Sequence, residues 1–240
     1  MDSKFFRPAV NSLLTAVAAV GILTVASAEE PKADGQKLAP LKYEIPKAMF
    51  IGTPKNLKAA PTLEPFSEKA PAPLQIPDGC TNLAKGKKVT SSDAAPIIGE
   101  LSLVTDGDKD GSDGSYVELA PGKQWVQIDL EKAADISAIV IWHYHAEGRV
   151  YHGVVVQLSD DPDFKKSVKT VFNNDFANAH GLGAGKNLEY VDSFYGKAIA
   201  VKDAKGQPLK ARYVRLYSNG NTSNDQNHYI EVEVYGKSAP

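Results

Sequence analysis

Cysteine is almost absent from this chain: its 240 residues include a single one, Cys80. One thiol cannot close a disulfide within the chain, so core packing must hold the fold even in an oxidising compartment. We interpret Cys80 as a free thiol, with an intermolecular disulfide as the alternative.

An excess of charge of either sign is also lacking, because the formal net charge is -2. A nearly balanced charge gives no electrostatic reason to expect a nucleic-acid partner. Apart from the first 28 residues, no apolar run is long enough to cross a bilayer.

The N-terminus has the order of a targeting segment. Lys4 and Arg7 precede the apolar run 13–26, and Ala26-Ser27-Ala28 fits the small-x-small cleavage rule. We predict a signal peptide at residues 1–28, and hence a secreted protein that is periplasmic or extracellular. An uncleaved membrane anchor is the alternative.

Proline is concentrated in one segment, residues 29–78. Because proline breaks regular elements, this composition predicts an extended tether. Its one apolar stretch, residues 42–52, could pack on the following domain or dock a partner. The prolines are Pro31, Pro40, Pro46, Pro54, Pro61, Pro65, Pro71, Pro73 and Pro77.

From residue 79 onward the pattern is that of short strands separated by turns, without sustained helical periodicity. This pattern predicts one all-β domain over residues 79–240, an antiparallel sandwich or barrel. The expected strands are 123–130, 136–145, 154–159, 169–172, 197–201, 211–218 and 229–236.

The stretch TDGDKDGSDGSYVEL, residues 105–119, gathers acid in one loop. Its start matches an EF-hand loop, but the twelfth position is Val117 and Glu118 comes one residue late. Both flanks also alternate like strands, so we reject an EF-hand. Crowded carboxylates suit a hard cation, and a solvated acidic turn explains the composition equally well.

Seven motifs in order give the chain from 82 to 236 a resemblance to discoidin, or coagulation-factor type C, domains and to family-32 carbohydrate-binding modules. The resemblance implies a galactose-binding-like, jelly-roll β-sandwich. The motifs are NLAKGKKVTSS (82–92), LVTDGDKDGSDGSY (103–116), QWVQIDL (124–130), ISAIVI (136–141), VVVQLSDDPDF (154–164), ARYVRLY (211–217) and IEVEVYG (230–236).

The resemblance also implies a structural Ca²⁺ between the acidic loop and the last strand, held by Asp106, Asp108 and Glu231. The loop is longer than usual, so Asp113 and Ser115 are added as candidate ligands. Strand alternation independently places Glu231 and Glu233 on one face and Ile230, Val232 and Val234 on the other, as would a solvated edge strand.

Histidines and loop residues supply the candidate ligand site. His143 and His145 share one strand face, which leaves a transition metal as a minor alternative. The resemblance places the end of this strand near sugar-binding loops. The candidate ligand-binding residues are His145, Arg149, Tyr151, His152 and Asn174.

These observations predict a secreted, non-catalytic carbohydrate-binding or adhesion module with a structural calcium, whose partner is a glycan or cell-surface polysaccharide. The alternative is a structural or protein-binding domain of the cell envelope without sugar affinity. Polar loop tips argue against a lipid ligand, and no paired acid–base constellation indicates an enzyme.

Overall fold

The computed structural model describes residues 36–51, 54, 57–67 and 69–238. The expected signal peptide lies outside these residues. Within them, no helix has the length and apolarity needed to cross a membrane.

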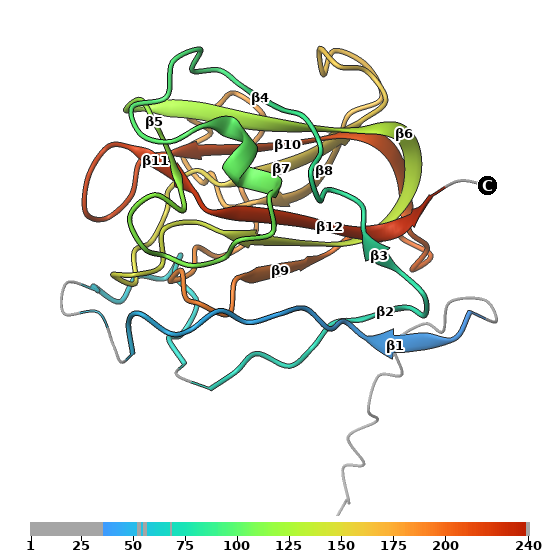
Figure 1. Ribbon diagram of the computed structural model, residues 1–240, viewed down its shortest axis with the longest axis horizontal. Coiled ribbons are helices and arrows are strands. Elements are labelled where there is room, and N and C mark those ends of the chain that lie inside the picture. Colours follow the sequence, from blue (N-terminus) through green and yellow to red (C-terminus); the bar gives the residue numbers. More distant parts are fainter. Residues whose placement is uncertain (1–35, 52–53, 55–56, 68, 239–240) are drawn as a thin grey trace, which may run out of the picture. The chain divides into compact units, whose positions relative to one another are not determined.

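The described chain is almost entirely β-structure with antiparallel pairing between its strands (Figure 1), which confirms the predicted fold class. One short 3-10 helix, η1 (Leu101–Thr105), interrupts the strands. The strands are β1 (Leu38–Pro40), β2 (Gln75–Pro77), β3 (Thr81–Asn82), β4 (Val89–Ser91), β5 (Val117–Leu119), β6 (Lys123–Trp142), β7 (Val155–Ser159), β8 (Lys169–Asn173), β9 (Lys197–Ala200), β10 (Leu209–Asn219), β11 (Asn227–Tyr229) and β12 (Glu231–Ser238).

Strand β6 runs through both layers of the sandwich. Its first half pairs with β4 and β10, and its second half pairs with β12 and β9. Figure 1 shows the strand curving back at one end of the molecule, where Glu131 has a positive φ of 69°. The segments predicted as separate strands, 123–130 and 136–145, are therefore one bent strand that ends at Trp142.

The main core lies between the two layers and is built by alternate residues of each strand. Val126, Ile128, Ile139 and Ile141 point into it from β6, and Val232 and Val234 from β12. Ile230 was predicted to share their face, but it lies before β12 begins and belongs to a second cluster.

The segment before the acidic loop was expected to be a strand and is instead η1. Val104 is fully buried and packs in the main core. The alternation of ELSLVTD therefore reflects one buried side of a helical turn, since a short helix can imitate a strand pattern over so few residues.

The proline-rich segment is extended, as predicted, but it is not free of the domain. We call its described residues between 36 and 77 the strap. Its two ends pair as β1 and β2, and Leu41 N–H donates to the carbonyl of Leu74 at 2.7 Å. In Figure 1 the strap runs below β9 and β12 along one side of the sandwich.

The strap closes a second apolar cluster on the outer side of β6 and β12. Leu41 and Ile76 of the strap are 6% exposed and pack with Val140 and Trp142 of β6. The Tyr43 ring meets the Trp142 ring edge-on at 5.3 Å. Of the two possibilities left open for the apolar stretch 42–52, Tyr43 shows packing on the domain, and burial of apolar side chains holds the strap on the sheet.

Candidate functional site

The aspartates of the acidic loop mostly cap their own backbone. Asp106 Oδ1 accepts from the N–H of Asp108 at 2.7 Å, and Asp108 Oδ1 accepts from the N–H of Asp110 at 2.9 Å. Ser115 Oγ donates to Asp108 Oδ2 at 3.0 Å. These contacts are the usual local turns of aspartate, and they leave Asp108 exposed and Ser115 half-buried.

Glu231, at the start of β12, is the one predicted metal ligand that is fully buried. Its Oε2 accepts from the N–H of Gly107 at 3.1 Å, while its Oε1 is buried without a hydrogen-bond partner. Burial raises the pKa of Glu231 to about 9, and the neighbouring carboxylates of Glu233 and Asp106 push it in the same direction. A buried carboxyl with a free oxygen needs either a proton or a cation.

Lys109 brings a buried ammonium group to the same loop. Its Nζ lies 3.0 Å from Glu233 Oε1, and both side chains are 7% exposed. Tyr235 donates to the other oxygen of Glu233 at 2.8 Å. The predicted outward pair Glu231 and Glu233 is thus not a solvated edge, since one member is paired with an ammonium and the other is buried.

The predicted calcium ligands fit a cation only in part. Among the described residues, no three His, Cys, Asp or Glu side chains are close enough together to hold a metal ion. The set Asp106, Asp108, Asp113, Ser115 and Glu231 is therefore not gathered at one point. The free oxygen of Glu231 beside Asp106 suits a hard cation, with loop carbonyls as the remaining oxygen ligands.

Three of the predicted sugar contacts are structural residues. His145 is 1% exposed and its Nε2 lies 3.0 Å from the carbonyl of Lys109. Asn174 is 2% exposed and accepts from the N–H of Val154. Tyr151 is 1% exposed and stacks on His143. Burial withdraws these three side chains from solvent, so their assignment as ligand contacts is corrected, although His145 Nδ1 and Asn174 Nδ2 are buried without a hydrogen-bond partner.

Tyr151 also begins a hydrogen-bonded chain to the surface. Its hydroxyl lies 2.9 Å from Nδ1 of His228, whose Nε2 lies 3.0 Å from Glu118. Burial lowers the pKa of His228 to about 3, and the positive charge of Arg149 acts in the same direction. The ring is therefore neutral at pH 7, with the Tyr151 hydroxyl donating to Nδ1 and Nε2–H donating to Glu118.

Arg149 is also largely withdrawn from solvent, at 9% exposure. Its guanidinium donates twice to Glu147 Oε2, at 3.0 and 2.8 Å, and lies 4.6 Å from the centre of the Tyr144 ring. The strap lies close to the same loop, because a Cβ added to Gly148 would come within 2.8 Å of Pro54. Arg149 is therefore not an open sugar contact either.

His152 is the predicted ligand residue that remains accessible, with a side chain 45% exposed. Its Nδ1 lies 2.8 Å from Glu189 Oε1, which leaves Nε2 free. The pair borders a cleft of about 680 Å³ between the strap and the loops of the sandwich. The cleft is lined by Leu57, Lys58, Ala60, Leu63, Val150, His152, Glu189 and Thr222.

The strap is bonded to the sandwich beside this cleft. Glu189 N–H donates to the carbonyl of Thr62 at 2.7 Å, and Glu64 N–H donates to the carbonyl of Glu189 at 2.8 Å. Thr62 Oγ1 lies 3.4 Å from the second oxygen of Glu189. Sequence reasoning missed Glu189, Lys58 and Thr222, since no motif or spacing joins three separate segments.

The comparisons with known proteins place the domain in a class. Residues 103–216 match the F5/F8 type C family model described as NedA-like, galactose-binding domain. Residues 103–216 therefore match a galactose-binding-like domain of the F5/F8 type C class, which confirms the resemblance seen in the sequence over that part of the chain. No curated protein matches the chain.

Solved structures with this fold are distant. A family 89 glycoside hydrolase from Clostridium perfringens gives a TM-score of 0.49 at 19% identity, over 66% of this chain and 15% of that chain. Chitosan-binding module 1 of a Paenibacillus sp. IK-5 enzyme gives a TM-score of 0.45 at 21% identity, over 65% of this chain and 99% of that chain. A Streptococcus pneumoniae fucose-binding module gives a TM-score of 0.45 at 18% identity, over 66% of this chain and 99% of that chain. These likenesses are too distant to indicate a ligand.

Proposed function

We propose that this protein is a secreted, non-catalytic carbohydrate-binding module whose sugar site is the cleft at His152 and Glu189. The observation that carries the proposal is an open cleft lined by both polar and apolar side chains, in a domain of the galactose-binding-like class. Such a mixed lining suits a sugar, which has hydroxyl edges and apolar C–H faces.

The side chains of His152 and Glu189 supply polar contacts of the proposed sugar site. Glu189 fixes the ring of His152 by accepting from Nδ1–H, so Nε2 is presented as an acceptor for a sugar hydroxyl. Lys58 supplies donors, and Leu57, Leu63 and Val150 supply apolar contact. The lining holds no Trp, Tyr or Phe ring, so affinity for one sugar should be weak, on the order of 0.1–1 mM. Retention on a polysaccharide would then come from many equivalent epitopes.

A glycan array followed by titration calorimetry tests this function. His152→Ala should weaken binding at least tenfold, because the exposed ring contributes little to folding but carries the free acceptor. His180→Ala is the comparison variant, since that histidine does not line the cleft and its ring meets the ring of Tyr217 edge-on. No binding over a broad glycan set, or equal losses in the two variants, would contradict the proposed site.

A structural calcium is the second part of the proposal. Glu231 and Asp106 would hold it, and the ion would supply the positive charge that the buried carboxylate of Glu231 lacks. Its effect would be to tie the acidic loop to β12.

Metal removal tests that part. A cation that binds the folded state alone stabilises it by mass action, by about 2.7 kcal/mol at a hundredfold excess over Kd. Chelation should lower the melting temperature of the wild type, and Glu231→Gln should abolish the difference between calcium-loaded and chelated protein. An unchanged melt in protein shown metal-free by elemental analysis would rule the ion out.

A protein-binding role in the cell envelope is the second candidate function. The strap carries large apolar side chains that are exposed, namely Leu38 at 45%, Ile45 at 49% and Ile51 at 78%. Exposed apolar groups of this size are typical of protein contacts. If cross-linking in intact cells captured a protein through the strap while glycans failed to bind, this role would replace the sugar site.

A further inference from the structure

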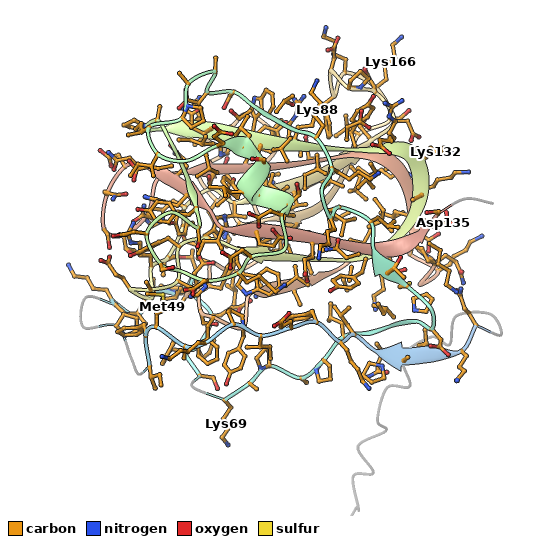
Figure 2. All side chains as sticks on the ribbon, in the orientation of Figure 1. Met49, Lys69, Lys88, Lys132, Asp135 and Lys166 are labelled. Atoms are coloured by element: carbon orange, nitrogen blue, oxygen red, sulfur yellow. The ribbon has the colours of Figure 1, made fainter. Side chains whose placement is uncertain are left out.

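The charges of this chain are unevenly distributed in space. We call the end of the sandwich where β6 turns back the bend end; it comprises the segments 85–88, 131–135, 160–169 and 202–210. Figure 2 places Lys88, Lys132 and Lys166 toward this end. Apart from Lys85, whose side chain lies beside Gly107 of the acidic loop, its exposed lysines are Lys88, Lys132, Lys165, Lys166, Lys169, Lys202, Lys205 and Lys210.

Register and contacts bring these segments together. Lys210 and Lys237 flank Asp135 in neighbouring strands. Lys169 Nζ donates to the carbonyl of Lys210 at 3.2 Å, and the carbonyl of Lys88 accepts from Asp129 N–H at 3.1 Å. The lysines therefore form one surface, although they are spread over more than a hundred positions of sequence.

Most acidic groups at the bend end are already engaged. Asp161 accepts the backbone N–H groups of Asp163, Lys165 and Lys166 at 3.0–3.1 Å. Asp203 accepts two more, at 2.8 and 2.9 Å, within its own turn. Hydrogen bonds from these amides lower the pKa of both aspartates.

Three further acids near this end are paired with single partners, whereas Asp135 and Asp160 are exposed and make no ion pair among the described residues. Asp129 holds Arg212 through two bonds of 2.8 Å, and Glu131 pairs with Lys87. Asp163 pairs with Lys165. Within the described chain no ion pair engages Lys88, Lys132 or Lys166, and the lysines of the bend-end segments outnumber the aspartates and glutamates there, so the surface keeps an excess of positive charge.

We propose that the bend end is a second binding surface, whose ligand is an acidic polysaccharide bearing carboxylate or sulfate groups. The cations offered are lysines, which act as point charges and need no fixed geometry in the ligand. The arginines of this region are committed, Arg212 to Asp129 and Arg215 to Gln127. The surface therefore recognises a run of negative charge and not the shape of one sugar.

Two other negatively charged ligands, an anionic membrane and a single-stranded nucleic acid, fit this surface less well. Membrane insertion needs exposed apolar groups, and the large one at this end is Val168, at 37% exposure. Single-stranded nucleic acid is held by aromatic rings that stack on bases, but the ring of Phe164 lies 4.1 Å from the guanidinium of Arg215 and is already covered. An extended acidic polysaccharide requires neither feature.

This surface is independent of the proposed sugar cleft. His152 precedes β7 and Thr222 follows β10, whereas the 160–169 segment follows β7 and the 202–210 segment leads into β10. The two sites therefore lie at opposite ends of the same strands, and each can be removed without the other.

Affinity electrophoresis and calorimetry with the full mature chain test the proposal, using polyuronate and dextran sulfate as probes and neutral dextran as the blank. We expect retention by both polyanions, lost between about 0.05 and about 0.5 M NaCl because salt screens exposed charges. The triple variant Lys88→Gln/Lys132→Gln/Lys166→Gln should bind about a hundredfold more weakly at low salt, at about fivefold per lysine.

The matched control is Lys42→Gln/Lys69→Gln/Lys186→Gln, which removes the same charge from exposed lysines elsewhere. It should keep binding within about threefold of the wild type. An equal loss in both triple variants would overturn the location. Retention by anionic vesicles or duplex DNA but not by the polysaccharides would overturn the ligand class. His152→Ala should leave polyanion binding unchanged, which separates this proposal from the sugar cleft.

Discussion

The two halves of strand β6 present opposite outer faces. In the first half, Trp125, Gln127 and Asp129 point away from the core, and Gln127 accepts hydrogen bonds from Arg215 of the next strand. In the second half the outward residues are Ala138, Val140 and Trp142, all fully buried. The strap covers the second half and leaves the first half open.

The difference shows what the strap contributes. A sheet face exposed to water carries polar groups, whereas a sheet covered on both sides becomes apolar throughout. In VQID (126–129) apolar and polar residues alternate, whereas AIVIW (138–142) is apolar throughout. The sequence of the second half therefore already indicates that both of its faces are covered. The strap is thus part of the domain's packing, and it also supplies one wall of the proposed sugar cleft.

The largest test of this comparison is Trp142→Ala. Trp142 is fully buried beneath Tyr43, and its indole N–H donates to the carbonyl of Phe194 at 3.0 Å. The cavity should cost about 3–5 kcal/mol in the free energy of unfolding and should speed proteolysis of the strap. Urea denaturation measures the loss.

Trp125→Ala on the open half of the same strand is the control for that variant. Its ring lies 4.3 Å from the guanidinium of Arg215 and is only partly buried. We expect a cost of about 1–2 kcal/mol, because less area leaves water on folding. Equal losses at the two tryptophans would show that the strap adds nothing to the burial of the second half.

An effect smaller than that of Trp142→Ala is expected from Lys109→Met, which acts on a charge under the covered face. The change leaves the buried carboxylate of Glu233 without its ammonium partner, and such a loss costs about 3 kcal/mol. The double variant Lys109→Met/Glu233→Gln should recover most of it, since Gln can still accept from the Tyr235 hydroxyl. Additive losses in a double-mutant cycle would mean that the pair is not coupled.

The fold could be predicted from the sequence because strand periodicity and turn residues are local signals. Val232 and Val234 point inward as their alternation indicates, and the predicted segments 154–159, 169–172 and 211–218 coincide with β7, β8 and β10. The path of the strap could not be predicted, because proline-rich composition reports local stiffness and says nothing about a distant apolar face. The uninterrupted apolar run that ends at Trp142 was the one feature of the sequence that indicated a second covered face.

The candidate site was less predictable than the fold. His145, Tyr151 and Asn174 are residue types that bind sugars, but the same donors and acceptors also satisfy buried backbone and side chains. These three side chains are structural because they are buried. Their burial depends on contacts with loops that are distant in the sequence. His152 remained accessible, and its partner Glu189 comes from a segment that no spacing connects to it.

The smallest expected effect concerns Arg215, on the open face. Its guanidinium lies between the rings of Trp125 and Phe164, at 4.3 and 4.1 Å, and Nε donates to Gln127 at 2.8 Å. Arg215→Ala should cost about 1 kcal/mol, because Arg215 and both rings are only partly buried and because water can reach Gln127, now 8% exposed, once the guanidinium is removed. Arg215→Lys should recover only part, since lysine lacks the planar fork. The denaturation midpoint and the fluorescence of Trp125 report the change. A loss above about 3 kcal/mol in the free energy of unfolding would show that this face contributes as much to stability as the covered face. The proposed difference between the two halves of β6 would then be wrong.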